Sequence, residues 1–138
     1  MKPPNPSYAG KGRNAKLVWD YSVDNQGKLL GIIYSVKERS GTFTGMLVKS
    51  TDGSVMNHQS IPAAYKGRVR IEGRASLVVE NVTPQDNTEF KCALVPNSGT
   101  DLESTVQLIV TGTQDIHLLQ MIKSSVFFHH LTSGDWRH

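Results

Sequence analysis

The chain contains a single cysteine, Cys92, among its 138 residues. One cysteine cannot form a disulfide within the chain, and it excludes a zinc site built from several cysteines. Cysteine content therefore does not assign the protein to an oxidising compartment. If Cys92 lies inside a folded core, we expect it to pack as a small hydrophobic residue.

Long apolar runs are also missing. No stretch reaches the roughly 18 to 20 consecutive apolar residues that a membrane-spanning helix requires. The first 13 residues are rich in Pro, Gly, Asn and Lys and lack the apolar centre of a secretory signal. We therefore predict a disordered lead over residues 1–12, and we expect membrane attachment only through regions that are not in this chain.

Charge of one sign is scarce, since the formal net charge is +3 and the fifteen basic residues are spread along the chain. The densest basic group comprises Lys66, Arg68 and Arg70, which would share one face of an extended segment, as solvated strand faces often do. No aromatic stacking pattern accompanies them, so nucleic-acid binding is not expected.

Motifs of catalysis are absent from the sequence. It has no Gly-rich phosphate loop, no serine nucleophile elbow and no metalloprotease helix motif. Cys92 falls in the middle of a predicted strand and points inward, which disfavours a Cys/His nucleophile. His129 and His130 are adjacent, so their side chains project in different directions and would not share a metal ion. We expect no enzyme activity, no metal and no cofactor.

The sequence does contain many short β-rich runs separated by turn signals. Hydrophobic residues make up 38% of the chain, enough for one core at this length. Alternation predicts the inward side chains as Leu17, Trp19, Tyr21, Ile32, Tyr34, Val36, Leu77, Val79, Phe90 and Cys92. The predicted strands span residues 15–23, 29–37, 44–50, 54–59, 68–72, 75–81, 88–95 and 104–110. Such a pattern predicts an all-β sandwich or barrel.

The stretch from Gly67 to Cys92 is the most specific part of the sequence. Its segments GRVRI, SLVV and NVTPQDNTEFKC resemble strands D, E and F of a variable-type immunoglobulin domain. The positions that match are Arg68, Leu77, Val79, Asp86 and Cys92. The resemblance covers residues 13–110 and implies an immunoglobulin-like, two-sheet Greek-key sandwich of the variable type. Arg68 would offer a planar fork of donors to the carboxylate of Asp86.

Three departures from that family pattern concern the core. Trp19 occupies the strand B position of the first family cysteine, so the usual inter-sheet disulfide would be missing and Cys92 would stay a thiol. Burial of the indole would recover part of the stability that the bridge normally provides. Tyr34 is the best substitute for the strand C tryptophan, and Phe90 replaces the tyrosine of the corner before strand F.

The resemblance also implies two recognition surfaces. Residues 44–50 and 54–59 are assigned as strands C′ and C″, and the face of strands G, F, C and C′ would bind a protein ligand or form a homodimer. The loops at one end would supply the other surface, with candidate binding residues Asp24, Asn25, Asp52, Asn97, Ser98 and Asp101.

Two further features lie at the margins of this scheme. Asn81-Val82-Thr83 is a possible N-glycosylation site, whereas Asn5-Pro6-Ser7 is excluded by its proline. Residues 111–138 form a tail that we predict to be disordered or a short helix, since residues 116–123 have an amphipathic pattern.

The function that the resemblance implies is a non-enzymatic protein-binding module. It would act in extracellular recognition, adhesion or an immune-type receptor ectodomain, outside the cell or at its surface. The alternative is an intracellular structural immunoglobulin repeat, which a free cysteine and no signal peptide favour. A soluble carbohydrate- or microbe-binding effector shares the same expected fold.

Overall fold

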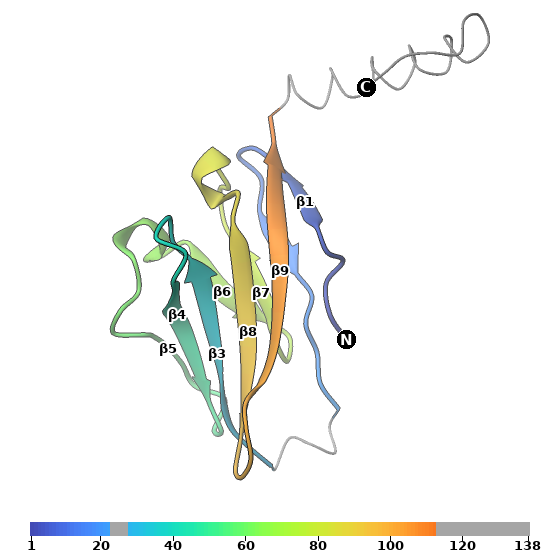
Figure 1. Ribbon diagram of the computed structural model, residues 1–138, viewed down its shortest axis with the longest axis vertical. Helices are drawn as coiled ribbons and strands as arrows, with labels where there is room; N and C mark the ends of the chain where they lie inside the picture. Colours follow the sequence, from blue (N-terminus) through green and yellow to red (C-terminus); the bar gives the residue numbers. More distant parts are fainter. Residues whose placement is uncertain (23–27, 113–138) are drawn as a thin grey trace, which may run out of the picture.

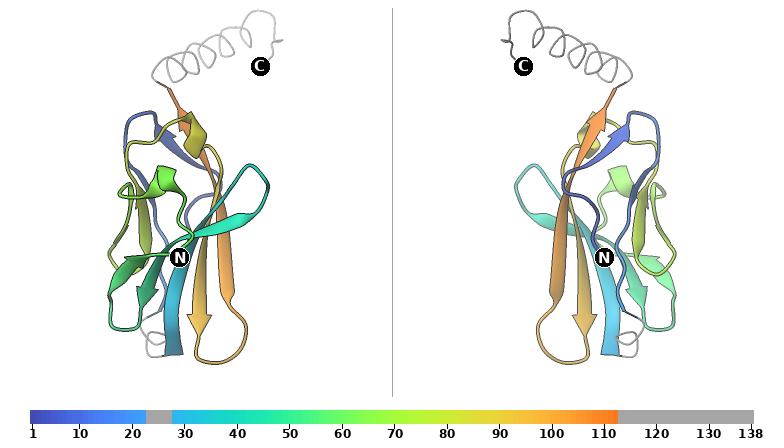
Figure 2. Two further views of the ribbon diagram at one scale, coloured as in Figure 1. Left: turned by 90° about the vertical axis from the view of Figure 1, so that its left-hand side faces the viewer. Right: turned by 90° about the vertical axis from the view of Figure 1, so that its right-hand side faces the viewer.

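A computed structural model describes residues 1–22 and 28–112 and shows two β-sheets packed face to face (Figures 1 and 2). The short 3₁₀ turns η2 (Ala63–Tyr65) and η3 (Pro84–Asp86) connect strands at one end of the sandwich. The strands are β1 (Ser7–Gly10), β2 (Ala15–Leu17), β3 (Leu29–Lys37), β4 (Phe43–Ser50), β5 (Val55–Asn57), β6 (Val69–Glu72), β7 (Ser76–Val79), β8 (Glu89–Pro96) and β9 (Leu102–Thr111).

The strand order identifies the architecture. The large sheet has six strands in the order β1-β9-β8-β3-β4-β5, and the small sheet has three in the order β2-β7-β6. All pairs are antiparallel except β1 with β9. Two strands, β4 and β5, extend the large sheet beyond β3, as C′ and C″ do in variable-type immunoglobulin sandwiches. The predicted fold class is therefore confirmed.

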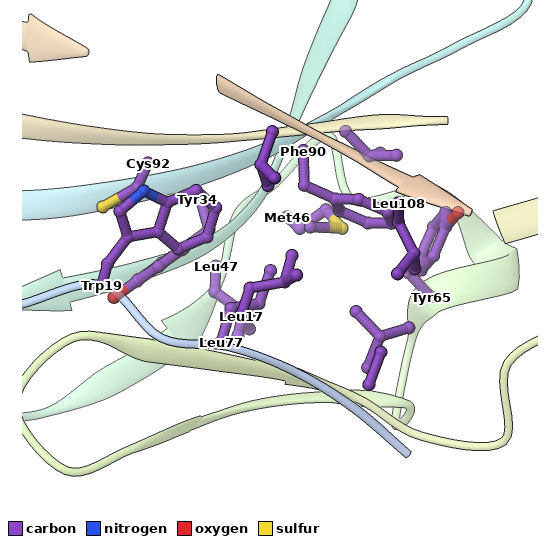
Figure 3. Packing of buried hydrophobic residues seen from close by; sticks show 14 of the residues in the cluster. Leu17, Trp19, Tyr34, Met46, Leu47, Tyr65, Leu77, Phe90, Cys92 and Leu108 are labelled. Atoms are coloured by element: carbon purple, nitrogen blue, oxygen red, sulfur yellow. The ribbon is translucent and has the colours of Figure 1, made fainter. Parts of the chain in front are cut away.

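The core between the sheets contains the side chains that alternation predicted (Figure 3). All of them are buried except Tyr21, which is only partly covered. The prediction missed Met46, Val82, Val106 and Leu108, which are also buried.

The N-terminal segment is ordered, so the predicted disordered lead is wrong where residues 7–10 form β1. This strand runs parallel to the end of β9, with Ser7 opposite Leu108 and Gly10 opposite Thr111. The backbone N–H of Lys11 donates to the carbonyl of Thr111 at 2.6 Å. Backbone groups of an edge strand gain from such pairing whatever the side chains are, and composition could not reveal it.

Strand β2 is shorter than predicted because it ends at Leu17 rather than at residue 23. Trp19 and Tyr21 therefore follow the strand and do not belong to it. Asp24 and Asn25 of the predicted loop, and the predicted tail after residue 112, lie outside the described residues.

Candidate binding surfaces

Arg68 and Asp86 form an ion pair at the end of the sandwich that carries η2 and η3. Nη1 of Arg68 donates to Oδ2 of Asp86 at 3.0 Å, and Nη2 donates to Oδ1 at 2.8 Å. The Asp86 side chain is 3% exposed and also accepts the backbone N–H of Thr83 at 2.9 Å. A buried carboxylate with three donors is well compensated, so the pair ties η3 to the start of β6.

The ring of Tyr65 packs against this ion pair. The Arg68 guanidinium lies 5.2 Å from the centroid of the Tyr65 ring, and that ring meets Phe90 edge-on at 6.0 Å. Burial, together with the nearby Asp86 carboxylate, raises the pKa of Tyr65 above its ordinary value. Tyr65 is therefore a neutral phenol at neutral pH, and its ring serves packing rather than acid–base chemistry.

Trp19, Tyr34 and Cys92 meet at the other end of the core (Figure 3). The rings of Trp19 and Tyr34 are 6.1 Å apart, and the indole Nε1–H donates at 2.9 Å to Oγ of Ser104, the strand partner of Cys92. Burial raises the pKa of the Cys92 thiol to about 12, so the thiol is neutral and a poor nucleophile at physiological pH.

The turns predicted to bind ligands gather at one end of the molecule. Figure 1 places the β4–β5 turn and the β8–β9 turn at the same end, where the N–H of Asn97 donates to the carbonyl of Lys28 at 2.7 Å. Oδ1 of Asp52 accepts the backbone N–H of Ser54 at 2.8 Å and its hydroxyl at 2.6 Å, which lowers the pKa of Asp52. Asp52 therefore shapes its own turn.

Asn97, Ser98 and Asp101 are exposed in the β8–β9 turn, where Gly99 has a φ of +92°. The structure thus brings together two of the three loops that were predicted to bind ligands. The third loop, with Asp24 and Asn25, lies outside the described residues. Their side chains are small and polar, and they offer few apolar contacts to a partner.

The outer face of the large sheet carries an apolar row across four strands. Met56 lies opposite Val48, Val48 opposite Ile33, and Ile33 opposite Ala93. Their neighbours Leu47, Tyr34 and Cys92 point into the core, so the four side chains of the row lie on the outer face. Met56 is 60% exposed, Ile33 and Val48 are partly exposed, and Ala93 is buried at 5% exposure.

Charged pairs flank the apolar row on the same face. Lys37 and Glu89 lie 3.2 Å apart, and Lys91 lies 3.6 Å from Glu103. Nζ of Lys91 also lies 4.5 Å from the centroid of the Phe43 ring. An apolar centre with a polar rim is the usual anatomy of a protein–protein interface.

The outer face of the small sheet is different because ion-paired side chains cover its apolar residue Val78. Lys16 pairs with Glu72 at 3.0 Å, and Arg70 pairs with both Glu72 and Glu80. Val78 lies opposite Lys16 and Arg70 and is only 2% exposed. Long basic side chains cover the apolar surface here and leave little for a partner to bury.

The sequence analysis proposed this face as a binding surface but did not identify the residues of the row. In β3, the outward residue Ile33 lies between the inward residues Ile32 and Tyr34. An apolar residue at this outward position was the sequence signal that could have identified the row. The contribution of Val48 and Met56 depends on strand register. That register includes a shift between Tyr34 and Ser35 that the sequence does not encode in any simple pattern.

Within residues 1–22 and 28–112, no cluster of three or more His, Cys, Asp or Glu side chains could hold a metal ion. In the same part of the chain, no helix has the length and apolar character needed to cross a membrane.

The chain matches no protein-family model, and no curated protein matches it. Solved structures are similar in three dimensions. Murine CRIg has a TM-score of 0.61 at 16% identity, with 80% of this chain and 94% of that chain covered. Murine CEACAM1b has a TM-score of 0.59 at 16% identity, with 78% and 51% covered.

A third similar chain belongs to a structure on T-cell specificity and activation by the bacterial superantigen toxic shock syndrome toxin-1. Its TM-score is 0.61 at 16% identity, and the alignment covers 79% of this chain and 95% of that chain. Identities this low show the fold alone. Together with the strand order, they establish that this chain is an immunoglobulin-like β-sandwich.

Proposed function

We propose that this chain is a non-enzymatic protein-binding module of the variable immunoglobulin type. It acts in recognition or adhesion outside the cell, and it binds through the outer face of the large sheet. The observation that carries this proposal is the apolar row of Ile33, Val48, Met56 and Ala93, which crosses a solvent-facing sheet surface. The similarity in fold to CRIg and CEACAM1b supports an immunoglobulin-like binding module in general.

The contrast between the two outer faces strengthens this assignment. Ion-paired side chains cover the outer face of the small sheet. On the outer face of the large sheet, Met56 is largely exposed beside Val48. A partner that covers the row removes apolar surface from water without breaking a charge network. The flanking pairs Lys37–Glu89 and Lys91–Glu103 provide both signs of charge, so a second copy of the chain can complement them.

Sedimentation velocity of the full chain over a wide concentration range tests the homophilic form of this function. We expect a reversible dimer that Met56→Glu abolishes, because the new carboxylate would be buried in an apolar interface without a partner. The matched control is Val55→Glu in the same strand. Val55 lies opposite Lys49, whose Nζ reaches toward the small sheet to bond the Arg74 carbonyl at 2.7 Å, so this change leaves the outer face intact.

A dimer that survives Met56→Glu but not Val55→Glu would overturn the assignment of the face. A chain that stays monomeric at every concentration would exclude self-recognition. Fluorescent tetramers of the chain would then be compared with tetramers of Met56→Glu for binding to cell surfaces. Equal binding by the two tetramers, or no binding by either, would contradict the proposed face.

An intracellular structural repeat is the second candidate, and the free buried thiol of Cys92 supports it. Such a domain needs no disulfide in a reducing compartment. A complete transcript separates the two: an encoded signal peptide supports the extracellular role, and tandem copies of this domain without one support the repeat.

A further inference from the structure

We infer that Asn81 is an attachment site for an N-linked glycan and that the glycan stands at the end of the sandwich, away from the apolar row. The inference rests on the proposed extracellular role, because the modification requires passage through the secretory route. Asn81-Val82-Thr83 is the one acceptor tripeptide in the sequence whose middle residue is not proline.

The local backbone presents Asn81 to solvent from a fixed position. Val82 is fully buried, its N–H donates to the Arg13 carbonyl at 2.9 Å, and its own carbonyl accepts the N–H of Gly12 at 2.8 Å. The N–H of Asn81 donates to Oδ1 of Asn14 at 3.1 Å, and Asn81 itself is exposed. A glycan on this side chain therefore does not displace any part of the core.

Asn81 and Thr83 each have a local structural role as well. Asn81 has a φ of +52°, a left-handed conformation that asparagine tolerates better than most residues. The Thr83 hydroxyl donates to Oε1 of Gln85 at 2.8 Å just before η3. These roles explain the residue types singly, and the experiment must separate them from acceptor function.

The position of the site decides what a glycan covers. The segment between β7 and β8 lies at the opposite end of the sandwich from the β8–β9 turn (Figure 1). A groove of about 870 Å³ begins beside Asn81, with Tyr65, Gln85 and Asn87 among its lining residues. Its amide groups can hydrogen-bond sugar hydroxyls. The apolar row lies at mid-strand on β3 and β8, so it stays open to a partner.

The chemistry is transfer of an oligosaccharide from a lipid-linked diphosphate donor. A bond forms between Nδ2 of Asn81 and C1 of the first sugar while the C1–O bond to the diphosphate breaks. The amide nitrogen loses a proton, and the lipid diphosphate leaves. The transferase recognises the hydroxyl of Thr83, which serine can replace and valine cannot.

The test expresses the full chain behind a secretory signal in eukaryotic cells and measures its intact mass before and after peptide N-glycosidase treatment. We expect one glycan on a fraction of the parent and of Thr83→Ser, because Pro84 directly after the acceptor tripeptide disfavours transfer, and none on Thr83→Val or Asn81→Asp. Asn81→Asp keeps a residue that accepts left-handed φ, so its loss of mass reports the acceptor rather than the backbone. Translation with microsomes scores the same variants without requiring secretion.

Folded parent chain without a glycan would overturn this inference and leave the proposed binding function intact. Sedimentation then tests the placement, because the glycosylated parent and Asn81→Asp should associate equally. Association that is weaker in the glycosylated form would show that the glycan reaches the apolar row, which would refute the placement. Loss of association in both forms would count against the proposed function and not against the glycan.

Discussion

Burial beside Tyr34 keeps the side chain of Cys92 a neutral thiol. The environment raises its pKa from 9.0 to about 12, while the thiol of an unfolded chain ionises near the ordinary value. Above pH 9 the unfolded state therefore binds fewer protons than the native state. Stability that is fully present below pH 9 is lost as the pH rises toward 12.

Chemical unfolding of the parent and of Cys92→Ala between pH 8 and about 11 checks this linkage. We expect the parent to lose up to about 1.4 kcal/mol more per pH unit than the variant over the upper part of that range, the value for one proton. Burial is the largest cause of the raised pKa of Tyr34 and is common to both proteins, whereas Cys92 adds to it in the parent alone. Only the slopes are compared, since the alanine variant also leaves a cavity. Equal slopes would show that Cys92 is not shielded from water.

For single residues, the sequence predicted whether a side chain is buried and which charged partner it has. Burial of Trp19, Tyr34 and Cys92 follows from alternation, and the Arg68–Asp86 pair follows from the resemblance. The hydrogen bond from the Trp19 indole to Ser104 could not be predicted, because it joins residues 85 positions apart. Such contacts depend on register and sheet packing.

Glycines in β3 and β4 let neighbouring segments of the chain approach closely, because glycine has no Cβ. A Cβ on Gly31 would lie 2.7 Å from the backbone carbonyl oxygen of Lys49. A Cβ on Gly45 would lie 2.6 Å from Cδ2 of His58, an atom of a side chain that can rotate away. A side chain at Gly31 would therefore meet fixed backbone, whereas a side chain at Gly45 would meet only another side chain.

We expect Gly31→Ala to destabilise the protein by about 1–3 kcal/mol, the range for overpacking that forces a backbone shift. Gly45→Ala should cost less, because only the His58 side chain moves, although its Nδ1 then gives up the Ser60 hydroxyl at 2.7 Å and the Ser60 N–H at 3.1 Å. Urea unfolding of both variants measures the difference. A larger loss for Gly45→Ala would mean that His58 is fixed and that the β3–β4 pair is the more adaptable one.

The elements also show where sequence patterns fail. The predicted range 29–37 of β3 is matched at both ends because its long apolar alternation is bounded by turn residues. The sequence of β1 has no such signal, because this segment is a strand only through its pairing with the edge of β9. β2 stops at Leu17 even though Trp19 continues to alternate, because backbone pairing with β7 ends there.

At the scale of the whole molecule, no disulfide joins the two sheets, since Cys92 is a free thiol. Side-chain hydrogen bonds join them instead. Oη of Tyr34 donates to the Ala75 carbonyl at 2.5 Å, Lys49 donates to the Arg74 carbonyl at 2.7 Å, and the Trp19 indole donates to Ser104 in β9. These ties, together with the shared core, should make the sandwich unfold as one cooperative unit.

Native-state hydrogen exchange tests that cooperativity directly. We expect the slowest amides of β3, which is paired on both sides, and of β7, the centre of the small sheet, to have the same opening free energy. Amides of the edge strand β5 should exchange faster, because its three residues are all exposed. If β7 exchanged through an opening of clearly lower free energy than β3, the sheets would be separate units. The core around Trp19 would then not replace the coupling that a bridge provides.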